Sequence, residues 1–369
     1  MDLSRRELLT ASALLWASPK AAFCAAAESS TGTQPIVLCW NENPYGPSPA
    51  ARAVISGTIP VSCRYPDEEI NQLTESLAQI EGVATDHIVV GSGSGELLCA
   101  LGLLHGRNSG EIIAAEPTYA ELTNYAQHAG AQLKFVPVDK QLNHDLAAMR
   151  AAVSPKTRAI YVCNPNNPTG TAISAESIRS FVGSLPDSVT TIVDEAYLDF
   201  ADDGAVRSVA DLVSAGKRVV VLRTFSKIHG MAGVRCGYAI ARPDVAAEIA
   251  AVRMSSPNIF AMRAARASLG DKTFLADTRR RIVASRTHIT AELTRLGLAY
   301  ARPQTNFVFF DTGAPLSQFD KFMKARNILV GRLFPPYNNW CRITIGTEPE
   351  VTAFLQGLRA YSGRHAAAA

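Results

Sequence analysis

Lys227 lies in a segment, residues 224–238, that combines an amine with hydroxyl groups, glycines and an arginine. The segment follows the short β-branched run 218–222, which predicts a buried strand. A lysine just beyond such a strand can point into a cleft, where an unprotonated, desolvated amine attacks a carbonyl carbon and forms an imine. Taken alone, the segment fits this chemistry and a solvated lysine in a strand-to-loop connection equally well.

Groups that could hold a phosphate surround this lysine. Thr224 and Ser226 offer hydroxyl donors, and Arg235 offers a planar fork suited to phosphate. The glycine-rich turn 91–96 stands between a predicted strand and a predicted helix, an arrangement that cradles phosphate on backbone N–H groups. Many such turns are glycine-rich for steric reasons alone. An imine-forming lysine beside a phosphate site indicates pyridoxal phosphate (PLP).

Other candidate groups also follow predicted strands. Tyr119 could stack on a flat ring, and the loop 164–170 presents side-chain amides between two prolines. Asp194 ends an apolar strand, where a carboxylate is costly unless it is paired, and a pyridinium N–H would pair it. Tyr197 could reach the same ring. Each motif alone also has a structural interpretation, such as a tyrosine at the core edge or an aspartate that caps a helix.

The elements that must position these residues alternate between strand and helix from about residue 85 to 240. This alternation predicts an α/β fold with a mostly parallel sheet, which binds ligands beyond the carboxyl ends of its strands. The strands and helices after about residue 255 lack the alternation and indicate a smaller α+β domain. Arg332 and Arg342 lie at the ends of its predicted strands, where a guanidinium could clamp a carboxylate or pair with a surface acid.

Length and composition limit the class of protein and the kinds of partner to be expected. A chain of 369 residues with 47% hydrophobic and 19% charged residues can bury a large core and belongs to the ordinary globular class. The formal charge of +3 gives no reason to expect a nucleic-acid or membrane partner. Seven cysteines form no C-x-x-C pair, so we expect no metal site, and the sequence leaves their disulfide state open.

The first residues predict an export signal. Arg5 and Arg6 precede a largely apolar run, 8–17, and small residues at 21–27, as in a twin-arginine signal cleaved near residues 25–27. The run is too short for a membrane span, and an apolar N-terminal helix is the alternative. We therefore expect a periplasmic or exported protein, or a cytoplasmic one if the signal is not used.

A series of ordered strings marks the chain from about residue 41 to 348. They are N-E-N-P-Y-G-P, R-Y-P-D, G-S-G-S-G-E, P-T-Y, N-P-N-N-P-T-G, D-E-A-Y, T-F-S-K-x-x-G-x-A-G-x-R-x-G-Y and R-I-T-I-G-T. In these strings the chain resembles the fold-type-I PLP aminotransferases, in particular the histidinol-phosphate aminotransferase group. The expected division is a twin-arginine signal at 1–27, an N-terminal arm at 28–50, a large PLP-binding domain at 51–254, a small domain at 255–364 and a tail at 365–369.

The resemblance implies roles for single residues. Lys227 would form the imine with PLP and move the proton between the substrate Cα and the cofactor C4′, and Asp194 would keep the pyridine nitrogen protonated. The other expected cofactor contacts are Asn167 and Tyr197 at the ring O3′, Tyr119 on the ring face, and Ser94, Gly95, Thr224, Ser226 and Arg235 at the phosphate.

The substrate and the partner subunit would be reached by other residues of the resemblance. Arg342 would bind the α-carboxylate, while Tyr45 and Arg332 would shape the side-chain pocket. Tyr65 would reach the cofactor phosphate in the site of a neighbouring subunit, which implies a homodimer.

The expected reaction is amino-group transfer between an L-amino acid, or an amino-alcohol phosphate, and a 2-oxo acid. A PLP-dependent decarboxylase or lyase resembling threonine-phosphate decarboxylase shares much of the same motif set. A PLP-binding protein without turnover is the third alternative, although binding alone would not require the set formed by Lys227, Asp194 and Tyr197.

Overall fold

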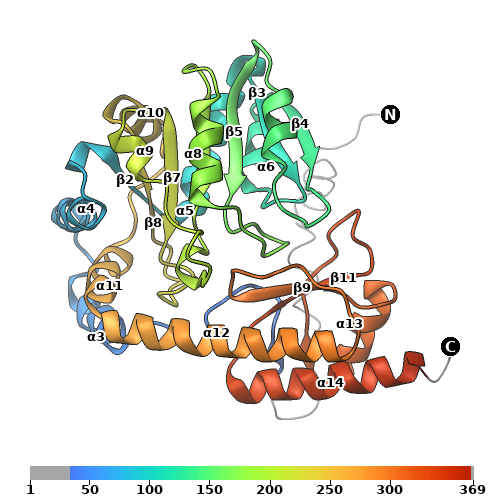
Figure 1. Ribbon diagram of the computed structural model, residues 1–369. Helices are drawn as coiled ribbons and strands as arrows, with labels where there is room; N and C mark the ends of the chain where they lie inside the picture. Colours follow the sequence, from blue (N-terminus) through green and yellow to red (C-terminus); the bar gives the residue numbers. More distant parts are fainter. Residues whose placement is uncertain (1–33, 367–369) are drawn as a thin grey trace, which may run out of the picture.

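The computed structural model of the protein describes residues 34–366 (Figure 1). The predicted export signal at 1–27 therefore lies outside the described residues. Among residues 34–366, none of the helices combines the length and the apolar character that crossing a membrane would require.

One seven-stranded sheet forms the upper part of the molecule in Figure 1. Its spatial order is β2-β8-β7-β6-β5-β3-β4. The strands are β2 (Ile88–Gly91), β3 (Glu111–Glu116), β4 (Gln132–Pro137), β5 (Thr157–Cys163), β6 (Thr190–Asp194), β7 (Val219–Thr224) and β8 (Gly237–Ile240). The two pairings made by β8 are antiparallel and the other pairings are parallel, which confirms the predicted mostly parallel sheet.

Helices cover both faces of this sheet. They are α3 (Pro49–Thr58), α4 (Asp67–Glu81), α5 (Ser94–Gly106), α6 (Glu121–His128), α7 (Leu146–Ala151), α8 (Ala175–Gly183), α9 (Asp211–Ser214), α10 (Pro243–Val252) and α11 (Ile259–Gly270). Successive residues of β7 point to opposite faces: Val219 and Val221 join one buried cluster, and Val220 and Leu222 join another. Burial on both sides explains why this strand is apolar without a break.

A second layer of short strands lies below the large sheet in Figure 1. There β9 (Phe307–Asp311) pairs antiparallel with β11 (Trp340–Thr344), and β1 (Ile36–Val37) pairs parallel with β10 (Ile328–Leu329). The helices α12 (Lys272–Arg295), α13 (Leu316–Lys324) and α14 (Glu348–Ala366) pack on these strands. The N-terminal arm thus enters the smaller α+β part before the chain builds the large sheet.

Some local predictions differ from the structure. The strand expected before the glycine-rich turn 91–96, where the alternation starts at about residue 85, begins as the 3-10 turn η3 (Thr85–His87), and only Ile88–Gly91 pairs with a neighbour. α7 and the antiparallel strand β8 were not expected as separate elements. Ala261 and Met262 of α11 belong to the buried cluster that covers the large sheet, although α11 follows the boundary expected at residue 255. The boundary itself stays a prediction.

Candidate active site

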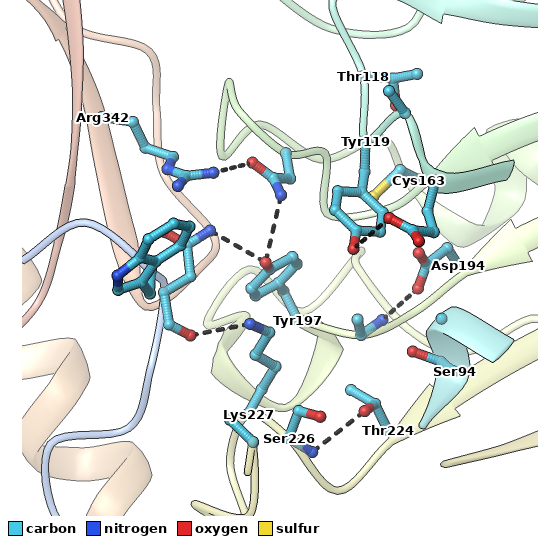
Figure 2. A pocket seen from close by; sticks show the side chains of 18 of the residues that line it. Ser94, Thr118, Tyr119, Cys163, Asp194, Tyr197, Thr224, Ser226, Lys227 and Arg342 are labelled. Atoms are coloured by element: carbon cyan, nitrogen blue, oxygen red, sulfur yellow. Dashed lines mark hydrogen bonds between the residues drawn. The ribbon is translucent and has the colours of Figure 1, made fainter. Parts of the chain in front are cut away.

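A cavity of about 280 Å³ opens where strands of the large sheet end, on the side that faces the small part of the chain. Figure 2 shows its side chains pointing toward one another from several elements. Of the predicted site residues, Tyr45 and Tyr65 do not line the cavity. The predicted residues that do line it are Ser94, Gly95, Tyr119, Asn167, Asp194, Tyr197, Thr224, Ser226, Lys227, Arg235, Arg332 and Arg342. The location of the cavity therefore agrees with the expectation that ligands bind beyond the carboxyl ends of the strands.

The amine of Lys227 enters the cavity from the loop after β7. Its Nζ donates a hydrogen bond of 3.1 Å to the backbone carbonyl oxygen of Asn41 and lies 5.3 Å from the centroid of the Tyr197 ring. Burial, followed by the nearby Arg342 guanidinium, lowers the pKa of Lys227 from 10.5 to about 8. A lysine with this pKa supplies free amine near neutral pH, as imine formation requires.

The carboxylate of Asp194 lies at the end of β6 and is 2% exposed. Its Oδ2 accepts a hydrogen bond of 3.0 Å from the hydroxyl of Tyr161, and its Oδ1 accepts one of 3.1 Å from the backbone N–H of Ala196. Burial raises the pKa of Asp194, and the two hydrogen bonds oppose that shift. A buried carboxylate of this kind gains from a cationic partner such as a protonated ring nitrogen.

The glycine-rich turn and the loop after β7 bring backbone N–H groups, hydroxyls and the Arg235 guanidinium to one part of the cavity, which we call the phosphate cup. The helix α5 begins at Ser94, its first turn has no side-chain cap, and Gly93 before it has φ +84°. A Cβ on Gly93 would collide with the guanidinium of Arg235, so the backbone can approach that group only without a side chain. Nη1 of Arg235 also donates a hydrogen bond of 3.3 Å to Oγ of Ser226.

A hydrogen-bonded chain crosses the cavity from the small sheet to the large one. Nη1 of Arg342, on β11, donates a hydrogen bond of 2.6 Å to Oδ1 of Asn167, and Nδ2 of Asn167 lies 3.5 Å from the hydroxyl of Tyr197 (Figure 2). Nη2 of Arg342 donates to the carbonyl oxygen of Cys39 at 2.8 Å, whereas its buried Nε has no hydrogen-bond partner among the described residues. Burial lowers the pKa of Arg342 to about 10, so the group stays cationic at neutral pH.

Two predicted site residues lie outside the cavity of their own chain. Tyr65 stands between η2 (Ile59–Val61) and α4 with 94% of its surface exposed. Tyr45 lies on the N-terminal arm, where its ring packs against the guanidinium of Arg281 at 5.2 Å from the centroid. Their expected roles stay predictions.

The structure also brings in residues that the sequence did not single out. Tyr161 reaches Asp194 from the neighbouring strand β5, and Trp40 and Phe334 add aromatic walls to the cavity. Asn41 contacts both Lys227 and Tyr197. Only Asn41 carried a signal, because it opens the string N-E-N-P-Y-G-P.

The donor set fits PLP. The cavity contains a lysine with a lowered pKa, a buried carboxylate for a ring nitrogen and a cup of hydroxyls, backbone N–H groups and one guanidinium for a phosphate. Within residues 34–366, no group of three or more histidine, cysteine, aspartate or glutamate side chains is placed to hold a metal ion.

Comparison with known proteins places this site in a family. Residues 33–358 match the model of aminotransferase class I and II. Histidinol-phosphate aminotransferase of Moorella thermoacetica is 35% identical over 88% of this chain and 84% of its own length. The aromatic amino acid aminotransferase of Cutibacterium acnes is 34% identical over 89% of this chain and 93% of its own length.

A solved structure agrees with these relatives. Histidinol-phosphate aminotransferase from Sinorhizobium meliloti in complex with pyridoxal-5'-phosphate has a TM-score of 0.85 and 27% identity, and the match covers 98% of this chain and 99% of that one. The fold, the cofactor and the class of reaction expected from the sequence are thereby confirmed. The chain belongs to the aminotransferase class I and II family, as a PLP-dependent transaminase of fold type I in the histidinol-phosphate aminotransferase-like group.

Proposed function

We propose that this transaminase moves an amino group to a 2-oxo acid from a donor with an aromatic or imidazole side chain, either an L-amino acid or an amino-alcohol phosphate. The observation that carries the proposal is the pairing of two guanidiniums with aromatic walls at one end of the cavity. Arg332 stacks over the ring of Phe334 at 4.4 Å, and Arg342 lies 5.0 Å from the same ring. A flat side chain can stack on such walls, and an anionic group can pair with either guanidinium.

Arg342 is the proposed anchor for the anionic end of the substrate. Arg342 is 7% exposed, and its guanidinium is held in place by Asn167 and the carbonyl oxygen of Cys39, so little side-chain freedom is lost on binding. Arg332 is exposed and donates a hydrogen bond of 3.2 Å to the neighbouring carbonyl of Leu333. We propose that Arg332 binds the distal end of the substrate side chain, where a phosphate or a second carboxylate would lie.

The residues of this chain divide the chemical work. When bound, PLP supplies an electron sink for the bond that breaks at the substrate Cα. With PLP bound, Lys227 would take and return the proton at that carbon, Asp194 would pair with the ring nitrogen and favour its protonated form, and Tyr197 and Asn167 would hold the ring through its oxygen. Thr224, Ser226 and Arg235 would hold the phosphate.

A half-reaction screen tests the substrate class. Single amino donors are added to the PLP-loaded enzyme and the loss of the visible absorption of the bound cofactor is followed. Histidinol phosphate and the aromatic amino acids should react faster than alanine, aspartate or lysine. A faster reaction with aspartate or alanine would contradict the proposal. Release of carbon dioxide, in place of a 2-oxo acid from an amino acid or a ketone from an amino-alcohol phosphate, would identify the lyase alternative.

The export signal and the homodimer remain proposals alongside this one. Cell fractionation and mass spectrometry of the mature N-terminus test whether the chain is exported and cleaved near residues 25–27, with Arg5→Lys/Arg6→Lys as the variant that should retain the precursor. Sedimentation of the PLP-loaded enzyme tests the dimer.

A further inference from the structure

Asn41 occupies a point where the N-terminal arm passes between the two parts of the molecule. Its side chain is 1% exposed, and its backbone has φ +57°, in the left-handed region that asparagine tolerates better than most residues. It follows β1 and Trp40, and it lines the cavity. A buried residue in this conformation is held by its surroundings on every side.

The small sheet holds Asn41 from one side. Its backbone N–H donates a hydrogen bond of 2.8 Å to Oγ1 of Thr344 on β11. Nδ2 of Asn306, just before β9, donates to the carbonyl oxygens of Asn41 and Glu42, both at 3.1 Å. The position of Asn41 is therefore set by β11 and by the residue that precedes its partner strand β9.

The two reactive side chains contact Asn41 from the other side. Nζ of Lys227 donates to its carbonyl oxygen at 3.1 Å, and its own Nδ2 donates to the hydroxyl of Tyr197 at 3.0 Å (Figure 2). The hydroxyl of Tyr197 also lies 3.5 Å from Nδ2 of Asn167. Because two amide donors approach this oxygen, the hydroxyl proton of Tyr197 remains to be donated into the cavity.

We propose that Asn41 is a positioning residue for the transamination reaction: its carbonyl oxygen aims the amine of Lys227, and its amide keeps Tyr197 a donor toward the cavity. Asn41 does not touch the reacting atoms and acts through these two side chains. Through its hydrogen bonds with Thr344 and Asn306, Asn41 also connects Lys227 and Tyr197 to the small sheet, which carries Arg342. The inference deepens the proposed function and rests on its chemistry.

The charges around Lys227 determine how a substitution at Asn41 would shift the protonation equilibrium of the Lys227 amine. Arg342 and Arg235 face the amine and favour its neutral form, while Glu42 and Asp194 favour the ammonium. Replacement of the neutral amide of Asn41 by a carboxylate would add a third anion near the amine. It would also give the hydroxyl of Tyr197 a strong acceptor and turn its proton away from the cavity.

Two substitutions separate the functions of the backbone and the side chain. Asn41→Gly keeps the left-handed backbone and its carbonyl, and removes the amide that contacts Tyr197. We expect kcat to fall about tenfold, the value of one hydrogen bond to a polar group, with KM changed less than about twofold because Arg342 is untouched. Asn41→Asp should raise the pH midpoint of Lys227 by about one unit or more.

The second measurement uses the apoenzyme and needs no substrate. Competitive acetylation of the PLP-free protein over a pH series, with mass spectrometry of the peptide that contains Lys227, gives the midpoint at which its amine becomes reactive. The midpoint should stay unchanged in Asn41→Gly and rise in Asn41→Asp. A wrong choice of substrate would leave this result intact, so failure of the proposed function and failure of this inference are distinguishable.

Asn108 provides the matched control. It has φ +58°, it lies exposed in the turn η4 (Arg107–Ser109), and it is not among the residues that line the cavity. Asn108→Gly and Asn108→Asp should leave kcat and the Lys227 midpoint unchanged. The proposal is overturned if Asn41→Gly turns over at the wild-type rate, or if Asn41→Asp leaves the Lys227 midpoint unchanged. Asn41 would then be needed only for the left-handed backbone conformation at this position.

Discussion

The hydroxyl of Tyr161 donates a hydrogen bond of 3.0 Å to Oδ2 of Asp194, from one parallel strand to the next. Both side chains are buried, at 0% and 2% exposure. The bond stabilises the carboxylate form of Asp194 against the burial that raises its pKa. Asp194 therefore depends on a second residue for the charge that it offers to the cofactor.

Removal of this donor should weaken cofactor binding. In Tyr161→Phe the buried carboxylate loses a hydrogen bond, so its pKa rises further and it pairs less well with a protonated ring nitrogen. We expect the Kd for PLP, measured by titration of the apoenzyme, to increase about tenfold. Tyr300→Phe, which removes a hydroxyl that contacts Thr294 on the exposed side of α12, should bind PLP as the wild type does. An unchanged Kd in Tyr161→Phe would show that the hydrogen bond does not support the cofactor.

The phosphate cup can be tested at one glycine. Gly93→Ala places a Cβ against the guanidinium of Arg235 and must displace it. The Kd for PLP should rise by about tenfold or more, since a charge-assisted phosphate contact is disturbed. Gly130→Ala is the matched control, because Gly130 has φ +91° and no atom within 4 Å of an added Cβ. Equal losses in the two variants would attribute the effect to backbone strain and not to Arg235.

The protonation of Lys227 should make the stability of the apoenzyme depend on pH. Its pKa is about 8 in the folded chain and 10.5 as the ordinary value, so between these two pH values the unfolded chain binds more protons than the folded one. The contribution of Lys227 to stability therefore rises with pH across that window and is unfavourable below it.

Lys227→Met removes the unfavourable term and should raise the Tm of the apoenzyme at pH 7 by about 2 °C or more, while turnover is abolished. The difference in Tm from the wild type should shrink as the pH approaches 10. Lys217→Met, at an exposed position, should change neither turnover nor Tm by a comparable amount. Persistent transamination by Lys227→Met would refute the assigned role of the lysine.

Arg342 should affect substrate binding and leave cofactor binding nearly unchanged. Arg342→Lys keeps a charge but loses the planar fork, so we expect KM to rise about 100-fold for donor and acceptor alike. The Kd for PLP should stay within about twofold. Arg326→Lys alters an exposed arginine that also stacks on a phenylalanine, Phe322, and should have no kinetic effect. A change confined to kcat would show that Arg342 acts on the chemical step.

A mixture of two inactive variants tests the proposed contribution of Tyr65 to a partner. Tyr65→Ala should lose activity if its ring completes a neighbouring site, and Lys227→Ala is inactive in its own site. Mixed dimers contain one site with a wild-type Lys227 and a wild-type Tyr65 from the partner subunit, so activity should return to about a quarter of the wild-type level on co-refolding. No recovery would place the role of Tyr65 within its own chain.

From the amino-acid sequence we could predict most strands of the large sheet and many of the residues that line the cavity. Lys227, Asp194 and Tyr119 could be assigned to one site because each lies at or just after the carboxyl end of an apolar strand, and parallel strands bring these ends to one edge. These are local signals: residue type, strand pattern and the turn that follows.

The contacts between segments that lie far apart in the sequence could be identified only in the folded chain. The bond from Tyr161 to Asp194 depends on which strands become neighbours, and Asn41 reaches Lys227 because β1 pairs with β10 near the end of the chain. Tyr45, which the sequence placed at the substrate, packs on Arg281 of α12. Such pairings depend on how whole faces are buried against one another, and no local pattern encodes that outcome.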